Sequence, residues 1–229
     1  MARKVLVSWS GGKDCAWALK VLRDDPAFEV AGLMTTVNLE SGRVSMHGIR
    51  PELLRRQARS LGLPLRTIGI PDPCPNEHYD AIMRRVVADA LEEGIECVAF
   101  GDLFLEDIRA YRESRLEGTG LAPVFPLWNM PTGGLAREMI DAGLRAFITC
   151  VDGSRLDPTF AGRLYDATFL TDLPGGVDHC GERGEFHTFV ADGPGFSAPV
   201  ACRPGPITER NGFIHVDLMP EAGMEIEGV

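Results

Sequence analysis

The sequence predicts an α/β fold built around a parallel β-sheet. Short apolar runs alternate with amphipathic segments through the first half of the chain. Each amphipathic segment is long enough to form the crossover helix that successive parallel strands need. A Gly-Gly pair follows the first apolar run directly and opens the first helical pattern. This order is typical of βαβ units.

Four strands and four helices are expected in the first part of the chain. Cys15, Ala18, Leu19 and Leu22 have the i, i+3, i+4, i+7 spacing of a helix face. Asn76 is expected to be the N-cap of a long helix that closes at Gly94 and buries Tyr79 in the core. We predict strands over residues 4–9, 28–37, 65–70 and 95–100, and helices over 14–22, 51–61, 77–91 and 105–116.

The pattern changes after residue 123, where Gly and Pro become frequent. We expect a helix over residues 135–144, a strand over 146–151, and shorter elements beyond. The predicted domains cover residues 1–124 and 125–229, and the second is a smaller α/β unit packed on the first. The acidic tail over 221–229 is expected to fray.

Composition and charge exclude several classes of protein. The chain has 229 residues, is 45% hydrophobic and 24% charged, and carries a formal net charge of −10. No run approaches the roughly 20 apolar residues of a membrane helix, and no secretory signal is visible, so we expect a cytoplasmic protein. The negative charge disfavours nucleic acid as the main partner, because phosphate neutralisation supplies most of such binding.

The six cysteines are widely spaced and form no CxxC pair. Close pairs are the usual signature of structural zinc, so such a site is disfavoured. We expect most of these thiols to be small buried apolar groups.

The segment Ser10-Gly11-Gly12-Lys13-Asp14 carries the chemistry. Two glycines allow a tight turn and close approach to a ligand. The unpaired N–H groups and the dipole of the following helix make an anion site. Ser10 adds a hydroxyl group and Lys13 a positive charge, which together suit a pyrophosphate group.

This loop lacks the spacing of a Walker A loop. It resembles the PP-loop of N-type ATP pyrophosphatases, with Cys15 where that superfamily often has Ser. The resemblance implies a HUP-like nucleotide domain, adenylation of a carbonyl or carboxylate, and release of AMP and pyrophosphate. Mg²⁺ normally bridges phosphates and one or two carboxylates, and Asp14 is the candidate carboxylate.

Later motifs narrow the resemblance. They are Gly101-Asp102, Pro126-Leu127-Trp128 and the segment CGERGEFHTF at residues 180–189. Together they resemble the diphthine–ammonia ligase family, whose late motif usually reads GEGGEFET. Arg183 replaces a common Gly of that motif, and His187 replaces a common acid. The resemblance implies that ATP and ammonia convert a carboxylate into an amide. It also implies that residues 1–124 form the ATP-binding domain and residues 125–229 a family-specific domain for the acceptor substrate.

The candidate site residues follow from these motifs. Glu182 and Glu185 could accept a proton from ammonium or position the acceptor, and an acidic pocket would concentrate a cation. His47 lies in a loop that could face the nucleotide, whereas Arg109 and Arg112 could simply be solvated. The predicted catalytic residues are Lys13, Asp14, Glu182 and Glu185; the nucleotide-binding residues are Ser10, Gly11, Gly12, Lys13, Asp14 and Gly101; the substrate-binding residues are Asp102, Glu182, Glu185 and His187.

Two other functions remain open at this stage. The first is a PP-loop enzyme that transfers sulfur to tRNA, which would be expected to have a cysteine pair and a basic surface. The second is a nucleotide sensor, which would bind ATP without cleaving it. The expected partners of the ligase are ATP, ammonia or another amine, and an unidentified carboxylate on a small molecule or a protein side chain. The sequence leaves the assembly state open, with a homodimer among the alternatives.

Overall fold

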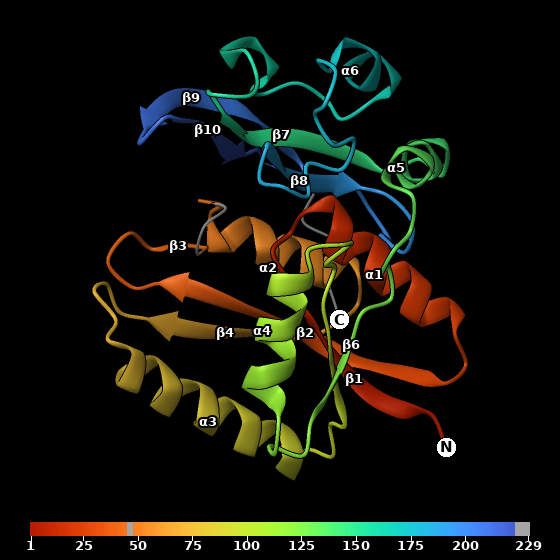
Figure 1. Cartoon of the computed structure of the whole chain (residues 1–229), viewed down its shortest axis with the longest axis vertical. Coiled ribbons are helices and arrows are strands. Elements are labelled where there is room, and N and C mark those ends of the chain that lie inside the picture. The colour runs from red at the N-terminus through yellow and green to blue at the C-terminus, as the bar shows by residue number, and fades with distance from the viewer. Residues whose placement is uncertain (45–47, 223–229) are drawn as a thin grey trace.

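A computed structural model describes residues 1–44 and 48–222 of the chain. His47, and all but the first two residues of the acidic tail, lie outside these ranges. Within them, the chain forms two sheets with two helices between (Figure 1).

The first sheet is mainly parallel and confirms the predicted fold class. β1 lies between β2 and β5, and β4 and β6 extend the sheet on either side, all with parallel pairing. A short antiparallel strand, β3, pairs with the end of β2. The strands are β1 (Arg3–Ser8), β2 (Phe28–Asn38), β3 (Arg43–Val44), β4 (Leu65–Ile70), β5 (Cys97–Ala99) and β6 (Ala122–Val124).

Helices cover both faces of this sheet. One face packs against α1 (Lys13–Asp24) and α2 (Pro51–Ser60), and the other against α3 (Asn76–Glu92) and α4 (Glu106–Leu116) (Figure 1). Trp17, Leu19 and Leu53 belong to the large core on the first face. Leu6, Ala90 and Val98 belong to a smaller core on the second face.

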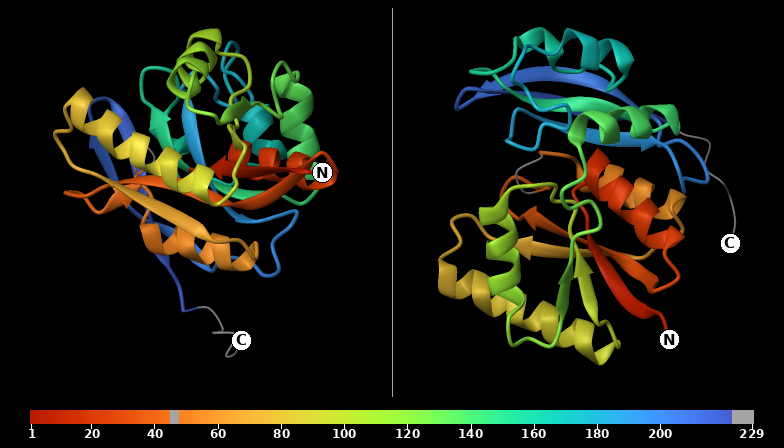
Figure 2. Two further views of the ribbon diagram at one scale, coloured as in Figure 1. Left: turned by 90° about the horizontal axis from the view of Figure 1, so that it is seen from below. Right: turned by 45° about the vertical axis from the view of Figure 1, so that its right-hand side comes forward.

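The second sheet is antiparallel, with strand order β8-β7-β10-β9. Its inner face lies over α1 and α2, and the two further views show the same layering (Figure 2). Buried residues of both sheets therefore share one core around these helices. The elements are α5 (Thr132–Asp141), β7 (Arg145–Asp152), η1 (Pro158–Phe160), α6 (Ala167–Asp172), β8 (Phe186–Asp192), β9 (Cys202–Arg210) and β10 (Phe213–Pro220).

Two sequence predictions about α3 are wrong. The N-cap is Pro75, whose extended backbone precedes the helix, and Asn76 is already the first helical residue. Tyr79 is only partly buried, because the apolar face of α3 borders a cavity rather than a filled core. The short strands β3 and β6 were not predicted, because they hold too few residues to show a pattern.

Two further expectations concern the chain as a whole. The boundary near residue 124 stays a prediction. Over residues 1–44 and 48–222, no helix is both long and apolar enough to cross a membrane.

Candidate active site

Residues 10–14, called the phosphate loop after the ligand predicted for them, lead from β1 into α1 at the carboxyl end of the first sheet. Gly11 has φ of 82°, a conformation that only glycine adopts without strain, and Gly12 is the N-cap of α1. Gly12 has no side chain to cap the helix, and its own N–H group donates to Ser10 Oγ at 3.3 Å. The thiol of Cys15 turns inward and donates to the Gly12 carbonyl at 3.1 Å.

The second sheet contacts this loop directly. The Lys13 backbone N–H group donates to Thr188 Oγ1 at 3.0 Å, and Val190 N–H donates to the Gly11 carbonyl at 2.8 Å. Thr188 and Val190 both belong to β8. The loop is therefore held by residues about 175 positions apart in the chain.

The Lys13 side chain is buried behind the loop. Its Nζ atom donates to Asp14 Oδ2 at 2.8 Å and to the carbonyl of Cys180, and it lies over the rings of Phe186 and Tyr165. Burial alone would lower the pKa of Lys13, but the Asp14 carboxylate raises it above its usual value. The ammonium group is thus charged, and it joins the loop to the second half of the chain.

Asp14 retains coordinating capacity. Its Oδ1 atom is buried and, over the described residues, has no hydrogen-bond partner. Burial raises the pKa of Asp14, and the Lys13 ammonium opposes that rise. Mg²⁺ in phosphate sites is bound by one or two carboxylates together with phosphate oxygens and waters. Asp14 fits that role, although residues 1–44 and 48–222 contain no group of three or more metal-ligating side chains.

Gly101 and Asp102 follow β5 and lie beside the loop. A Cβ atom on Gly101 would come within 2.8 Å of the Asp14 carbonyl carbon and 2.9 Å of the Cys15 nitrogen, so only glycine fits there. Asp102 Oδ2 accepts from Arg112 Nε at 3.4 Å. Arg112 was expected to be solvated, but it contacts this carboxylate and the Phe100 ring.

Residues 178–185 form a turn organised by two acidic side chains. Asp178 Oδ1 accepts from the N–H groups of Cys180 and Glu182, and its Oδ2 accepts from the Thr132 hydroxyl group at 2.6 Å. Glu185 is fully buried, and its two oxygens accept from the N–H groups of Asp178 and Arg183. The Glu185 carboxylate is thus engaged within the turn itself.

Glu182 points out of this turn towards the end of β5. Its Oε1 atom accepts from Leu103 N–H at 2.7 Å and from Phe104 N–H at 3.4 Å. Burial raises the pKa of Glu182 to about 7, and the charges of Asp14 and Asp102 act in the same direction. A carboxyl group that titrates near neutral pH can both take up and release a proton during a reaction.

His187 and Arg183 differ in their exposure to solvent. Burial, the charge of Lys13 and His215 together lower the pKa of His187 to about 4, so the imidazole is neutral at pH 7. Arg183 is exposed, and its guanidinium group lies over the Phe104 ring.

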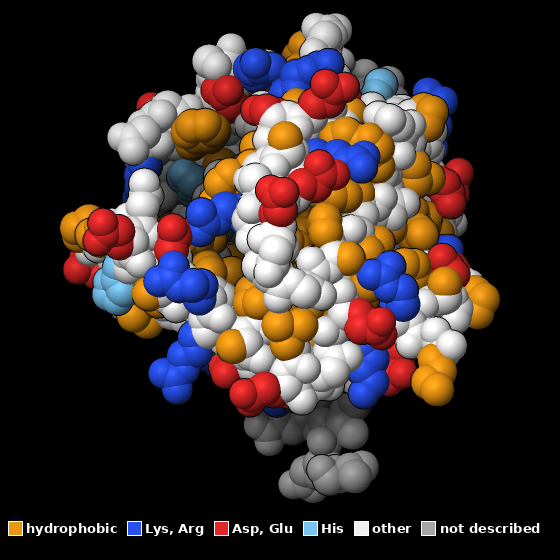
Figure 3. All heavy atoms as spheres, turned by 60° about the horizontal axis from the view of Figure 1, so that its bottom comes forward, with side chains coloured by type: hydrophobic (Ala, Val, Ile, Leu, Met, Phe, Trp, Pro, Cys, Tyr) orange, Lys and Arg blue, Asp and Glu red, His pale blue; other side chains and the backbone are white. Residues whose placement is uncertain are grey.

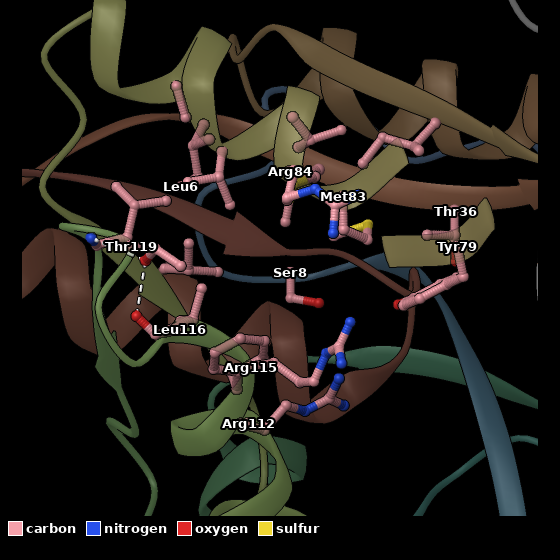
Figure 4. Close-up of a pocket in the computed structure, with 18 of the residues that line it drawn as sticks. Leu6, Ser8, Thr36, Tyr79, Met83, Arg84, Arg112, Arg115, Leu116 and Thr119 are labelled. Atoms are coloured by element: carbon pink, nitrogen blue, oxygen red, sulfur yellow. Dashed lines mark hydrogen bonds between the residues drawn. The ribbon is translucent and has the colours of Figure 1, made fainter. Parts of the chain in front are cut away.

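A cavity of about 750 Å³ adjoins the phosphate loop between the first sheet, α3 and α4. That volume is in the range of small-molecule sites. Ser8 lies in the middle of it, Leu6 and Leu116 line an apolar end, and Tyr79 lies at the other end (Figure 4). The guanidinium groups of Arg112 and Arg115 point into the space near Ser8 (Figure 4). Ser10 lines the cavity and belongs to the loop, so the two are continuous.

The structure thus gathers Ser10, Gly11, Gly12, Lys13, Asp14, Gly101, Asp102 and Glu182 around one loop. Sequence reasoning missed Gln57, Thr188 and Asp178, which hold this region together. Gln57 had a visible signal, because it interrupts the apolar helix face made by Leu53, Leu54, Ala58 and Leu61. Thr188 lies within the motif at residues 180–189, but nothing there pointed to a contact with the loop. The roles of the candidate residues stay predictions.

The surface carries mixed charge. On the face shown in Figure 3, basic and acidic side chains alternate and leave no large area of one sign. Arg115 pairs with Asp80, and Arg109 pairs with Glu113 at 2.8 Å. This face therefore lacks the continuous basic area that a nucleic-acid backbone requires.

Comparison with known proteins agrees with this geometry. A model of the diphthamide synthase N-terminal domain matches residues 3–122, and a model of the diphthamide synthase C-terminal domain matches residues 132–217. The diphthine–ammonia ligase of Homo sapiens is 29% identical over 153 residues, which cover 65% of this chain and 57% of that relative. The diphthine–ammonia ligase of Rattus norvegicus is 26% identical over 182 residues, which cover 76% of this chain and 67% of that relative. Because the two domain models together cover most of the sequence, the chain belongs to the diphthamide synthase family.

Proposed function

We propose that the chain is an ATP-dependent ligase that adenylates a carboxylate and amidates it with ammonia. One observation carries the proposal: the phosphate loop and the Glu182 turn meet at the end of β5. Lys13 bonds to the Cys180 carbonyl, and Glu182 bonds to Leu103 N–H beside Gly101. This closeness supports a single site, in which the phosphate loop would hold ATP and residues 178–185, called the acceptor motif below, would face the carboxylate. The relatives with the printed name diphthine–ammonia ligase support the same reaction class.

The proposed reaction has two steps. A carboxylate oxygen of the acceptor attacks the α-phosphorus of ATP, and pyrophosphate leaves. Ammonia then attacks the activated carbonyl carbon, AMP leaves, and the nitrogen loses a proton to give the amide. Holding the reactants together in the right orientation is the main contribution that the protein can make.

Four groups of the chain have distinct proposed roles. The N–H groups of the loop and the hydroxyl group of Ser10 bind the phosphates. Glu182 accepts the proton of the nucleophile, because its carboxyl group titrates close to neutral pH. Glu185 positions the acceptor motif through its two backbone contacts. His187 and Asp102 lie beside these groups and bind the acceptor.

Mg²⁺, when bound with ATP, neutralises charge on the phosphates and on the leaving pyrophosphate. Asp14 would hold it through Oδ1, while Lys13 adds a positive charge next to that carboxylate.

Diphthine is the acceptor that the names of the relatives suggest, and the chain spans only 57% of the human relative. The acceptor, a cytoplasmic location and a homodimer are therefore parts of the proposal.

The two alternatives are weaker. The family match does not favour sulfur transfer to tRNA, and no CxxC pair is present in the sequence. In a sensor that binds ATP without cleaving it, Glu182 would have no function beside the phosphate loop.

The proposal is tested by following the nucleotide products. The protein is incubated with Mg²⁺-ATP, ammonium and a panel of carboxylates that includes diphthine, and AMP, ADP, pyrophosphate and phosphate are resolved. We expect AMP and pyrophosphate in equal amounts, with the greatest stimulation by the true acceptor. ADP with phosphate, or ATP binding without turnover, would reject adenylation.

Two lysine variants on one helix provide the matched comparison. Lys13→Ala removes the buried ammonium group behind the loop and should abolish AMP formation. Lys20→Ala removes a surface lysine of α1 that pairs with Asp24 at 2.8 Å, and should leave turnover unchanged. Circular dichroism of both variants separates loss of function from loss of fold.

A further inference from the structure

Gln57 is a glutamine with no exposed surface, in the middle of the buried face of α2. A buried polar side chain is costly unless it is hydrogen-bonded. Its amide group lies directly against the phosphate loop, where a Cβ atom on Gly11 would come within 3.0 Å of Gln57 Oε1. The position of this amide and the path of the loop are therefore fixed together.

The amide joins three separate segments. Its Oε1 atom accepts from the Trp9 indole N–H group at 2.9 Å. Its Nε2 atom donates to the Gly11 carbonyl at 3.0 Å and to the Val190 carbonyl at 2.6 Å. Both N–H groups of the amide are thus used and join the phosphate loop to β8, while the amide oxygen holds Trp9 just after β1.

The link to β8 is doubled. Val190 donates its own N–H group to the Gly11 carbonyl at 2.8 Å, so this oxygen receives one bond from Gln57 and one from β8. β8 begins at Phe186, immediately after the turn that carries Glu182. A shift of the loop would consequently move the strand that continues from the acceptor motif.

We propose that Gln57 is a positioning residue that fixes the phosphate loop for the pyrophosphate end of ATP and couples the loop to β8. The inference rests on the proposed function, because it assumes that this loop binds ATP. Gln57 lies outside the loop and outside the acceptor motif, so neither sequence motif pointed to it.

The test compares nucleotides with and without the pyrophosphate group. Gln57→Met keeps the length of the side chain and removes all three hydrogen bonds. Binding of Mg²⁺ with α,β-methylene-ATP, measured by calorimetry, should weaken roughly tenfold to a hundredfold, the usual effect of leaving buried partners unpaired. Binding of AMP should stay unchanged, because AMP lacks the group that the loop would hold.

Ser60→Ala is the matched control. Ser60 lies one turn further along α2, where its hydroxyl group donates to the Ala198 carbonyl at 2.5 Å. The variant breaks a contact between α2 and the second half of the chain without touching the loop. It should lower stability and leave binding of the ATP analogue intact.

A double variant separates positioning from stability. Trp9→Phe with Gln57→Met removes the indole donor that the single variant leaves unpaired, so stability should partly return. Affinity for the ATP analogue should stay low relative to Trp9→Phe alone. Recovery of that affinity together with stability would mean that Gln57 is merely structural.

Hydrogen exchange of the wild-type protein gives a readout that needs no variant. Adding the Mg²⁺–ATP analogue should slow exchange in a peptide covering β8 as well as in the loop, because Val190 N–H bonds to Gly11. If hydrogen exchange slowed in the loop alone, the proposed coupling between the loop and β8 would be wrong. Failure of the wild type to bind the analogue would instead reject the proposed function, and equal binding by wild type and Gln57→Met would reject only the role of Gln57.

Discussion

At the scale of single residues, the site combines carboxyl groups in different environments. Glu185 is buried and occupied by backbone N–H groups, whereas Glu182 faces the phosphate loop with a pKa near neutral pH. The two carboxyl groups lie three residues apart, yet Glu185 organises the turn, whereas Glu182 has a raised pKa and is proposed to accept a proton.

The pKa of Glu182 predicts a dependence of turnover on pH. Its pKa is raised to about 7, and only the carboxylate can accept a proton, so kcat/KM for ammonium should rise as pH increases through this value. Glu182→Gln should lower the rate by roughly 100-fold or more and remove this limb of the profile.

The ionisation of ammonium also changes with pH, so wild type and variant are compared at each pH value. Their ratio cancels the supply of free ammonia and leaves the contribution of Glu182. A constant ratio between pH 6 and pH 8 would exclude Glu182 as the base, whichever residue binds the acceptor.

At the scale of secondary structure, the end of β5 packs against the first turn of α1. Gly101 leaves no room for a Cβ atom, because backbone atoms of Asp14 and Cys15 already fill that space. The start of α1 thus sets how closely the loop after β5, and Glu182 with it, approaches residues 10–14.

Gly101→Ala should therefore push α1 away from β5. We expect a loss of about 1–3 kcal/mol in the free energy of unfolding, as for other overpacked sites, and weaker ATP binding. Denaturant unfolding and calorimetry measure the two effects.

Gly134→Ala is the corresponding control in α5, where an added Cβ atom meets no other atom within 4 Å. It should raise stability slightly, since alanine favours a helix by up to about 1 kcal/mol, and leave ATP binding intact. Similar behaviour of the two variants would show that the space at Gly101 does not matter.

At the scale of the whole molecule, the two sheets are held together by packing against α1 and α2 and by a few polar contacts. The principal ionic contact is Asp217 of β10, which accepts from Arg43 of β3 at 2.6 Å and from Arg50 at 2.5 Å. Burial alone would raise the pKa of Asp217, but the hydrogen bonds from the two arginines lower it to about 2.

This contact predicts how stability responds to acid. A lowered carboxyl pKa stabilises the fold above the unfolded value of 3.8, and the contribution disappears as pH falls towards about 2. At pH 7, Asp217→Asn should cost about 1–2 kcal/mol, a figure reduced because the pair is partly exposed. The difference from wild type in thermal unfolding should vanish near pH 2.

Asp172→Asn provides the comparison, because Asp172 is half exposed and pairs with one arginine, Arg163, at 2.7 Å. Its substitution should cost less than about 1 kcal/mol. An equal effect of both substitutions at every pH would show that the Asp217 contact does not join the sheets.

The parallel α/β fold, the Gly-Gly turn after β1 and the family motifs could all be predicted from the sequence. These features are local: apolar periodicity reports strands and helices, and the Gly-Gly turn between β1 and α1 needs only adjacent residues. The spacing of residues along the chain was therefore sufficient to predict them.

The contacts between distant residues became visible only in the folded chain. Gln57 lies 133 positions from Val190, and Lys13 lies 167 positions from Cys180, so their contacts leave no short-range pattern. The surroundings of Glu182 and Glu185 also differ: Glu182 accepts from Leu103 N–H, 79 positions away, whereas Glu185 is fully buried within its own turn. Desolvation and long-range hydrogen bonding arise only once the two sheets have packed around α1 and α2, which is why the sequence could identify these carboxyl groups but not separate their roles.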